Sequence, residues 1–303
     1  MHVRSTRADI LLIIVATIWG LAFVAQRMGM ENLGPLGFNA ARFLLGALSL
    51  LPLLLIFKQK TKPETFNSLL KAGGLAGLVL FVGATLQQAG LVYTTASNAG
   101  FITGLYIVLV PLFGLTIGEK TSGNTWAGAI LGALGLYLLS VSEAFSINPG
   151  DLLVLASATA WAAHVLLISR LAPKHDNLRL AIAQFFVCAL LSAIAALFLE
   201  TNTLVLENFI AAFWPIVYAG LFSVGIAYTL QVVAQKDAPP SHAAIIMSLE
   251  TVFAAIGGWY VLNEQLNSRE LLGCGLMLTG MLLSQLPLKK LFRTDKKSTA
   301  DLI

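Results

Sequence analysis

Three ionisable side chains stand inside long apolar stretches of this 303-residue chain: Arg42, His164 and Glu250. A carboxyl group can bind and release a proton, a guanidinium can hold an anionic group, and an imidazole titrates near physiological pH. Such groups are costly in an apolar environment unless they are paired, so they are rare there and often functional. The three residues are therefore candidates for a binding or proton-transfer site.

Each of the three has more than one interpretation. Glu250 is the leading candidate for substrate binding and proton coupling, but it could be a structural carboxylate bonded to a neighbouring helix. Arg42 could extend outward to water or to Glu31, or turn inward toward Glu250 or an anionic substrate group. His164 is a second candidate for binding and proton coupling, and the alternative is a helix–helix hydrogen bond.

Amide and aromatic side chains complete the candidate substrate site, and without further strong charge they suit a neutral, zwitterionic or aromatic ligand. They are Trp19, Gln87, Tyr106, Trp161 and Gln231.

The sequence contains no motif that would predict an enzyme. It has no Walker loop, no G-x-S-x-G and no zinc signature, and no second histidine or cysteine stands at ligand spacing from His164. We therefore expect no catalytic residues, no metal and no cofactor.

Composition indicates that these residues lie in a membrane protein. Hydrophobic residues make up 57% of the chain and charged residues 11%, with a mean hydropathy of +0.81. A soluble domain carries about 25% charged residues, so lipid must solvate much of this chain. The net charge of +4 comes from Lys and Arg in short connectors and at the C-terminal end, which is typical of membrane topology and not of nucleic-acid binding.

Ten segments meet or approach the length of about 20 residues that a membrane helix needs. They are Asp9–Gln26, Leu36–Phe57, Leu69–Val92, Ala99–Ile117, Thr125–Val141, Leu152–Ser169, Leu180–Leu199, Phe209–Gln235, Ala243–Leu262 and Leu271–Leu288. With the N-terminus in the cytoplasm, the inner segments hold 16 of the 19 basic residues and the outer connectors hold two, Arg27 and Arg269. The positive-inside rule therefore places both termini in the cytoplasm.

The chain contains an internal duplication. Gln87 and Gln231 are 144 residues apart, as are Tyr106 and Glu250, while Trp19 precedes Trp161 by 142. We predict a first five-helix repeat at 8–142, a second at 150–288, and a basic cytoplasmic tail at 289–303. Because five spans is an odd number, the second repeat must enter the membrane upside down. This is an all-α fold of ten helices in two inverted repeats, a plan that recurs in secondary transporters.

Glycines recur four residues apart, as in Gly128 and Gly132 of the fifth span, and the tenth span is also rich in glycine (Gly273, Gly275 and Gly280). Small residues at such spacing let helix backbones approach closely. The sequence leaves open whether these spans pack within one molecule or form the face of a homodimer.

The ordered set of features resembles a known family. Ten spans in two halves, the Trp19-Gly20 pair, the run Arg42-Phe43-Leu44-Leu45, and the copies SNAGF…GE and SHAAI…NE are similar to the drug/metabolite transporter superfamily. Within it, they resemble the EamA-type transporters of bacteria over residues 8–288. The resemblance implies an inner-membrane carrier for amino acids, other metabolites or toxic amphiphiles. Many members have a proline after the acidic residue of span nine, whereas Thr251 follows Glu250 here.

We therefore expect a carrier that exports small amphipathic metabolites such as amino acids by alternating access, with the substrate and membrane lipid as its partners. A carrier of sugar- or nucleotide-linked metabolites is an alternative, but it would need two or more deep basic residues. A membrane protein that acts on lipid-linked substrates without transport is another. It would need clustered acids or histidines at one membrane face.

The inward interpretation of Arg42 gives a first prediction. An Arg42→Ala variant should still insert into the membrane but lose transport, because the cationic group that binds substrate is gone. Flux and expression of the reconstituted variant test this. Unimpaired flux at normal expression would remove Arg42 from the site.

Overall fold

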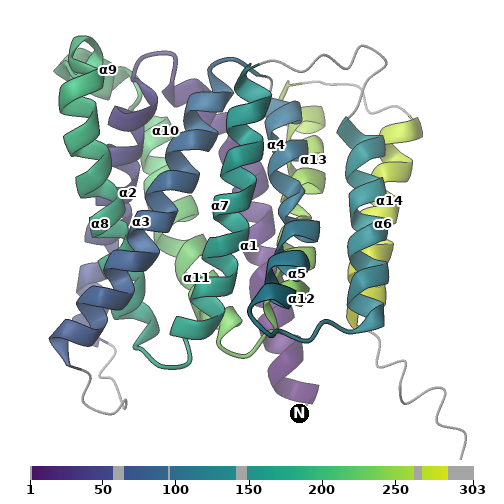
Figure 1. The fold of residues 1–303 in the computed structure, drawn as a ribbon. Coiled ribbons are helices and arrows are strands. Elements are labelled where there is room, and N and C mark those ends of the chain that lie inside the picture. Colours follow the sequence, from purple (N-terminus) through teal and green to yellow (C-terminus); the bar gives the residue numbers. More distant parts are fainter. Residues whose placement is uncertain (1, 57–64, 95, 141–148, 263–267, 286–303) are drawn as a thin grey trace, which may run out of the picture.

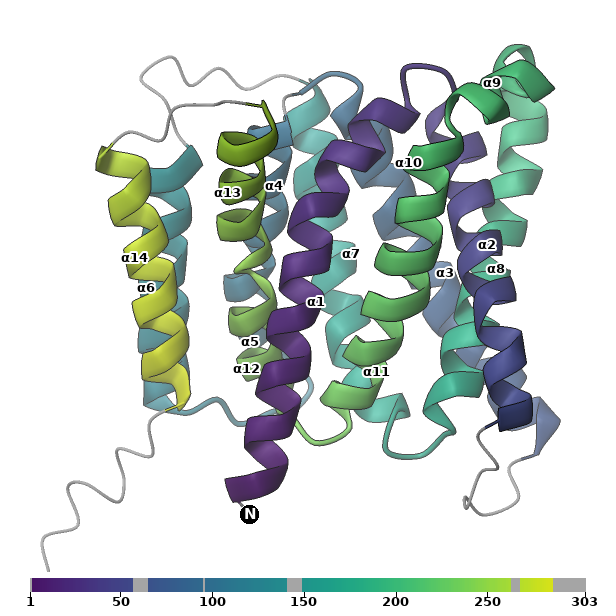
Figure 2. The ribbon, with the colours of Figure 1, turned by 180° about the vertical axis from the view of Figure 1, so that it is seen from behind.

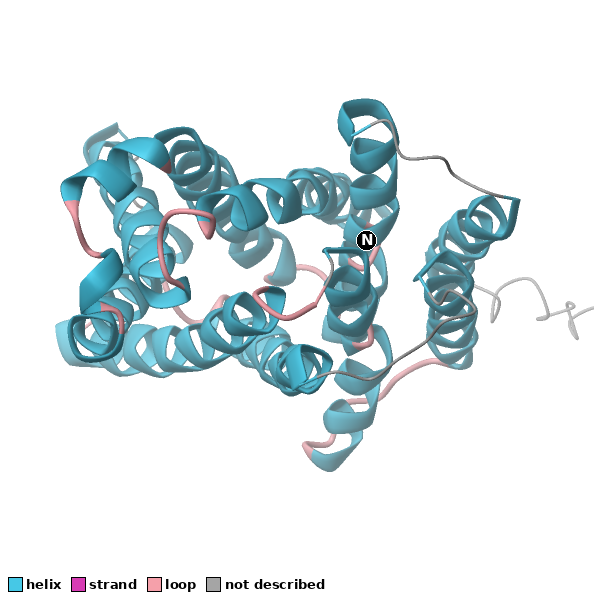
Figure 3. Ribbon diagram, turned by 90° about the horizontal axis from the view of Figure 1, so that it is seen from above, coloured by secondary structure: helices cyan, strands magenta, loops and turns pink. Residues whose placement is uncertain are grey.

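The computed structural model of the chain describes residues 2–56, 65–94, 96–140, 149–262 and 268–285, and regular structure in these ranges is entirely helical (Figures 1 and 3). The predicted tail at 289–303 lies outside the described residues. The α-helices are α1 (His2–Gly29), α2 (Pro35–Ile56), α3 (Phe66–Leu91), α4 (Ala96–Gly104), α5 (Tyr106–Thr116), α6 (Gly123–Ser140), α7 (Pro149–Leu171), α8 (Asn177–Leu199), α9 (Leu206–Ala211), α10 (Phe213–Val217), α11 (Thr229–Gln235), α12 (Pro240–Met247), α13 (Glu250–Leu262) and α14 (Ser268–Gln285). Two further elements are a 3₁₀ turn, η1 (Thr201–Thr203), and a π-helix, η2 (Tyr218–Tyr228).

Six helical segments in the described ranges are long and apolar enough to cross a membrane. They are Thr6–Gly29, Pro35–Ile56, Phe66–Leu91, Pro149–Leu171, Asn177–Leu199 and Phe213–Gln235. Three shorter apolar helical stretches add to them, at Ile102–Thr116, Pro240–Ile256 and Leu271–Ser284. The chain is thus an all-helical membrane protein, and helical residues occur in all ten predicted segments.

The outside of the bundle is as apolar as its inside. Leu55 and Phe198 are 84% and 81% exposed, while Leu12, Phe43 and Phe185 are fully buried. In water such a surface would be a large exposed patch; in lipid it faces acyl chains at no cost. The side chains that are polar and buried therefore stand out as the informative ones.

Helices that are distant in sequence pack side by side (Figures 1 and 2). α2 packs on α8, α3 packs on both α7 and α8, and α1 packs on α13 and η2. The start of α2 is also tied to the end of α8, because the Glu200 carboxylate accepts hydrogen bonds from the Leu36 and Gly37 N–H groups at 3.0 and 2.8 Å. These contacts supply partners for N–H groups that a helix N-terminus leaves unsatisfied.

α6 and α14 form a close pair at one side of the bundle (Figure 1). A Cβ atom on Gly128 would lie 2.6 Å from the Gly280 carbonyl oxygen, and one on Gly135 would lie 2.6 Å from the Gly273 carbonyl oxygen. The two backbones are therefore in direct contact at both crossings. Glycines of the fifth and tenth spans thus pack against each other within one chain, while a homodimer stays a prediction.

Two membrane helices are each interrupted by one tightened, 3₁₀-type turn in the middle of the bundle. Between α4 and α5 the Leu105 N–H donates to the Ile102 carbonyl at 3.2 Å, a three-residue step, and between α12 and α13 the Leu249 N–H donates to the Ile246 carbonyl at 3.2 Å. The interruption between α12 and α13 forms without a proline, since Thr251 and not a proline follows Glu250. Short 3₁₀ stretches inside helices often mark hinges.

The α6–α14 contact gives a second prediction. Gly280→Ala should destabilise the protein by about 1–3 kcal/mol, because its Cβ would meet backbone that cannot move aside cheaply. The unfolding free energy in a denaturing-detergent titration measures this. Gly275→Ala is the matched control on the same helix, since its Cβ would meet nothing within 4 Å, and it should change the free energy by about 0.5 kcal/mol or less. Equal effects of the two substitutions would contradict the packing argument.

Candidate functional site

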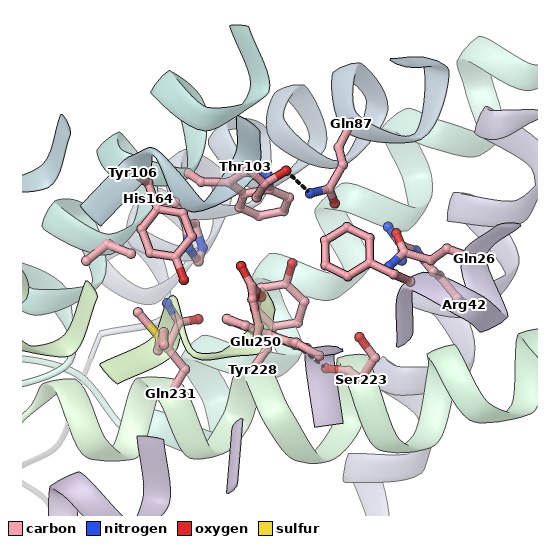
Figure 4. Close-up of a pocket in the computed structure, with 15 residues that line it drawn as sticks. Gln26, Arg42, Gln87, Thr103, Tyr106, His164, Ser223, Tyr228, Gln231 and Glu250 are labelled. Atoms are coloured by element: carbon pink, nitrogen blue, oxygen red, sulfur yellow. Dashed lines mark hydrogen bonds between the residues drawn. The ribbon is translucent and has the colours of Figure 1, made fainter. Parts of the chain in front are cut away.

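A polar cavity lies in the middle of the bundle, between helices from all parts of the chain (Figure 4). Its volume is about 40 Å³. The residues that line it are Trp19, Phe23, Gln26, Arg42, Gln87, Thr103, Tyr106, Trp161, His164, Val165, Ser223, Tyr228, Gln231, Met247 and Glu250.

All eight residues predicted as a substrate site line this one cavity. They come from seven helices: Trp19 from α1, Arg42 from α2, Gln87 from α3, Tyr106 from α5, Trp161 and His164 from α7, Gln231 from α11, and Glu250 from α13. The eight side chains therefore lie around the same cavity, while their roles in binding and proton coupling stay predictions.

The Arg42 side chain turns inward and does not reach outward to water. It is 3% exposed, and its guanidinium carbon lies 5.6 Å and 5.0 Å from the ring centroids of Phe38 and Phe43. Contacts of this kind stabilise a cation through the ring face. Within the described part of the chain, Arg42 forms no ion pair with Glu250 or Glu31, and its Nε atom has no hydrogen-bond partner. The cation thus lacks a protein counter-charge at contact distance.

Glu250 is the first residue of α13, directly after the tightened turn. It is 4% exposed. The Glu250 carboxyl and the Tyr106 hydroxyl lie close enough to interact with each other, but within the described residues neither Glu250 Oε1 nor the Tyr106 hydroxyl makes a hydrogen bond of full geometry. Backbone contact holds this point of α13, since a Cβ on Gly20 of α1 would lie 2.5 Å from the Glu250 carbonyl oxygen. The backbone of α13 at Glu250 therefore packs directly on α1.

His164 makes a contact between helices and also faces the cavity. Its Nε2 atom lies 2.9 Å from Oε1 of Gln184, which joins α7 to α8. This geometry matches the helix–helix alternative, and the ring still lines the cavity (Figure 4).

The two repeat-related amides have different partners. The Gln87 Nε2 group donates to the Thr103 hydroxyl at 2.9 Å (Figure 4), whereas Oε1 of Gln231 has no partner in the described structure.

Tyr228 is the main lining residue outside the eight predicted positions, although its type and its place in an apolar stretch match those of the predicted aromatic residues. Its ring centroid lies 4.6 Å from that of Trp19 and 6.2 Å from those of Trp161 and His164. The position 144 residues earlier is Ala84, so the duplication could not mark Tyr228. Its spacing of three residues from Gln231 on a helix could have done so.

The other unpredicted lining residues are Phe23, Gln26, Thr103, Val165, Ser223 and Met247. Ser223 contributes through its backbone: the Trp19 indole N–H donates to the Ser223 carbonyl at 3.2 Å. Ser223 lies in the π-helix η2, and π-helical turns are frequent at functional sites. A uniformly apolar run does not reveal such a turn in the sequence.

Buried polar atoms without a partner occur around the cavity and also elsewhere: six belong to lining residues, and nine others lie outside the lining in the described residues. In the described structure, six of its lining residues carry a buried polar side-chain atom with no hydrogen-bond partner: Gln26, Arg42, Tyr106, Trp161, Gln231 and Glu250. Native proteins leave few buried polar groups unsatisfied. The set includes donors, acceptors, a cation and a carboxyl group, so it can bind a polar molecule. No group of three or more His, Cys, Asp or Glu residues in the described ranges could hold a metal ion.

Curated relatives match the chain over most of its length. A protein of Archaeoglobus fulgidus, an uncharacterized transporter, is 34% identical over 290 residues, which cover 94% of this chain and 87% of the relative. The uncharacterized transporter YoaV of Bacillus subtilis is 26% identical, covering 90% and 94%. The uncharacterized inner membrane transporter YedA of Escherichia coli K12 is 27% identical, covering 88% and 86%.

The fold also occurs in a solved crystal structure, which is 19% identical in sequence. It covers 95% of this chain and 99% of its own, with a TM-score of 0.77. The model of the EamA-like transporter family matches residues 6–141 and 148–286. With both matches added to the polar cavity among apolar helices, the chain belongs to the EamA-like transporter family.

Proposed function

We propose that this membrane transporter carries small amphipathic metabolites, amino acids among them, through the central cavity by alternating access. The observation that supports this most directly is the ring of six unpaired buried polar atoms around a cavity inside an apolar bundle. Leaving such groups without partners is costly, and a polar substrate would supply the missing hydrogen bonds.

The charges of the cavity favour a zwitterion. Arg42 offers a buried cation without a counter-charge and would hold a carboxylate, while Glu250 and the Tyr106 hydroxyl would hold an ammonium group. The rings of Trp19, Trp161 and Tyr228 offer apolar surface for the rest of the substrate. The lining contains two basic side chains, Arg42 and His164, and the histidine can be neutral. A substrate that carries a phosphate group is therefore supported less well.

Alternating access follows from two inverted halves, which we propose at residues 8–142 and 150–288. The glycine contacts of α6 and α14 support this. Gly273 and Gly280 are the repeat equivalents of Gly128 and Gly135, at an offset of 145 residues. The Gly128–Gly280 contact and the Gly135–Gly273 contact are therefore equivalent, with the two halves exchanged. A two-fold axis between the halves produces this exchange.

Two other features follow the same axis. The tightened turns at Leu105 and Leu249 are 144 residues apart, and so are the carbonyls of Ile102 and Ile246 that accept their hydrogen bonds. Likewise α3 of the first half packs on α8 of the second, while η2 of the second packs on α2 of the first. Both halves therefore present equivalent hinges and equivalent neighbours.

The central cavity is small in the present conformation. A volume of 40 Å³ holds about three water molecules, whereas sites for small organic ligands measure about 300–1,000 Å³. Loading would require the halves to move apart, and we propose that the tightened turns before Tyr106 and Glu250 allow this movement.

Charge distribution supports an inner-membrane orientation with both termini in the cytoplasm. The end of the bundle at which the N-terminus lies (Figure 1) carries most of the described basic residues: Arg7, Lys71, Lys120, Arg170, Lys174, Arg179 and Lys236. The opposite end carries Arg27 and Arg269. Export would then run from the N-terminal end to the opposite end, with Glu250 as the principal proton carrier and His164 as the second candidate.

Counterflow in proteoliposomes against a panel of amino acids, with and without a pH gradient, tests this function. The wild type should exchange at least one amino acid, and a pH gradient should drive its accumulation. Glu250→Gln keeps the size of the side chain but cannot carry a proton, so it should lose at least about tenfold of gradient-driven accumulation while retaining exchange. Such a loss corresponds to about 1.4 kcal/mol.

Glu207→Gln is the matched control, because Glu207 is exposed and lies outside the cavity; it should behave as the wild type does. A protein that exchanges no member of the panel would overturn the amino-acid assignment. Gradient-driven accumulation by Glu250→Gln at the wild-type level would overturn the role of Glu250 in proton coupling.

A further inference from the structure

Polar side chains join the two halves at both ends of the bundle, away from the central cavity. At the N-terminal end, the lower end in Figure 1, His242 Nε2 of α12 lies 2.8 Å from Asp9 Oδ1 of α1, and His242 Nδ1 lies 3.3 Å from the Ser284 hydroxyl of α14. At the opposite end, the Thr94 hydroxyl donates to Asp151 Oδ1 of α7 at 2.5 Å. The Asp9–His242 and Thr94–Asp151 contacts each connect one half to the other, whereas His242 and Ser284 both belong to the second half.

The two aspartates occupy equivalent positions in the duplicated sequence. Asp9 precedes Trp19 by ten residues, and Asp151 precedes Trp161 by ten, so both pairs share the offset of 142. Asp9 binds the first turn of α12, and Asp151 binds the connector that leads into α4, the counterpart of α12. Equivalent aspartates thus make a contact at each end of the bundle, one with a histidine and the other with a threonine.

Both contacts are shielded. The side chains of His242 and Asp9 are 12% and 14% exposed, and Thr94 and Asp151 are 6% and 4% exposed as residues. A hydrogen bond to a carboxylate is strong where water is largely excluded, yet it can break and re-form. This combination suits a contact that must hold one conformation and then release it.

The surroundings of the lower contact are polar on the side of the membrane surface. Glu119, Lys120 and the hydroxyl groups of Thr121 and Ser241 line a second cavity of about 290 Å³ together with His242. Thr121 and Ser241 are themselves 3.3 Å apart and also join the two halves. This second cavity lies at the N-terminal end of the bundle, where the connectors that lead into α6 and α12 meet.

We propose that Asp9–His242 and Thr94–Asp151 are the two gates of the transporter, each of which closes one end of the central cavity and opens in turn. The proposal rests on the proposed function. Both contacts are present in this structure, which agrees with a central cavity too small for a metabolite. Opening of the lower gate separates α1 from α12, and opening of the upper gate separates α7 from the start of α4, so the two tightened helices move in opposite phases.

Cysteine accessibility from each side of the membrane tests the gates. Val165 lines the central cavity with an apolar side chain; Val165→Cys in a Cys188→Ala, Cys274→Ala background is the reporter. A membrane-impermeant thiol reagent is added to one side of vesicles of known orientation. Asp9→Asn should raise the labelling rate at least about fivefold from the N-terminal side alone, and Asp151→Asn should do so from the opposite side alone.

Matched controls and second variants separate a gate from a folding defect. Asp237→Asn and Glu207→Gln remove exposed carboxylates near the same two ends and should leave both rates unchanged. His242→Gln and Thr94→Val should reproduce the one-sided effects of their partners, and Asp9→Asn combined with His242→Gln should add little, as residues in one contact do.

Labelling that rises equally from both sides, or from neither, would overturn the gates. The readout needs no substrate, so it is independent of the amino-acid assignment. One-sided labelling in a protein that exchanges no amino acid would support the gates and overturn the amino-acid assignment. Normal amino-acid counterflow with unchanged labelling would support the assignment and overturn the gates.

Discussion

Polar groups placed in a hydrocarbon layer must face one another, and the rest of this structure depends on that constraint. Arg42 and Glu250 are 3% and 4% exposed in a bundle whose outer surface is mainly Leu, Ile and Phe. Turned toward lipid, either would cost several kcal/mol. The helices therefore converge on a small central cavity lined by polar groups, and under the proposed function a polar substrate would supply hydrogen bonds to its unpaired atoms.

Close backbone contacts hold that arrangement. Because Gly20 has no side chain, α13 can pack against α1 directly beside Glu250. In the same way, carbonyl groups of α6 and α14 lie 2.6 Å from the positions that a Cβ atom on the facing glycines would occupy. No hydrophobic effect drives helices together in lipid, so packing at this distance supplies much of the attraction. The contacts are rigid, while the tightened turns before Tyr106 and Glu250 and the two terminal hydrogen-bond clusters are the places where the proposed movement would occur.

Much of the candidate site could be predicted from the sequence because two signals mark it. Charge inside apolar stretches identifies Arg42, His164 and Glu250, and the 144-residue offset identifies Gln87 and Gln231. Tyr228 escaped because its counterpart is Ala84. The π-helix η2 escaped because an apolar run of sequence does not show how its backbone is bonded. Glycine spacing predicted close approach of α6 and α14 but carries no information about which helix each would meet.

Pulsed electron-paramagnetic distances between paired spin labels test the central claim most directly. One pair, at positions 120 and 237, spans the two halves at the N-terminal end, and the other, at positions 93 and 207, spans them at the opposite end; all four residues are exposed. If one cavity serves both ends in turn, a transported substrate and a pH gradient should lengthen one distance as they shorten the other. Distances that stay fixed, or that lengthen together, in protein that transports would contradict the account.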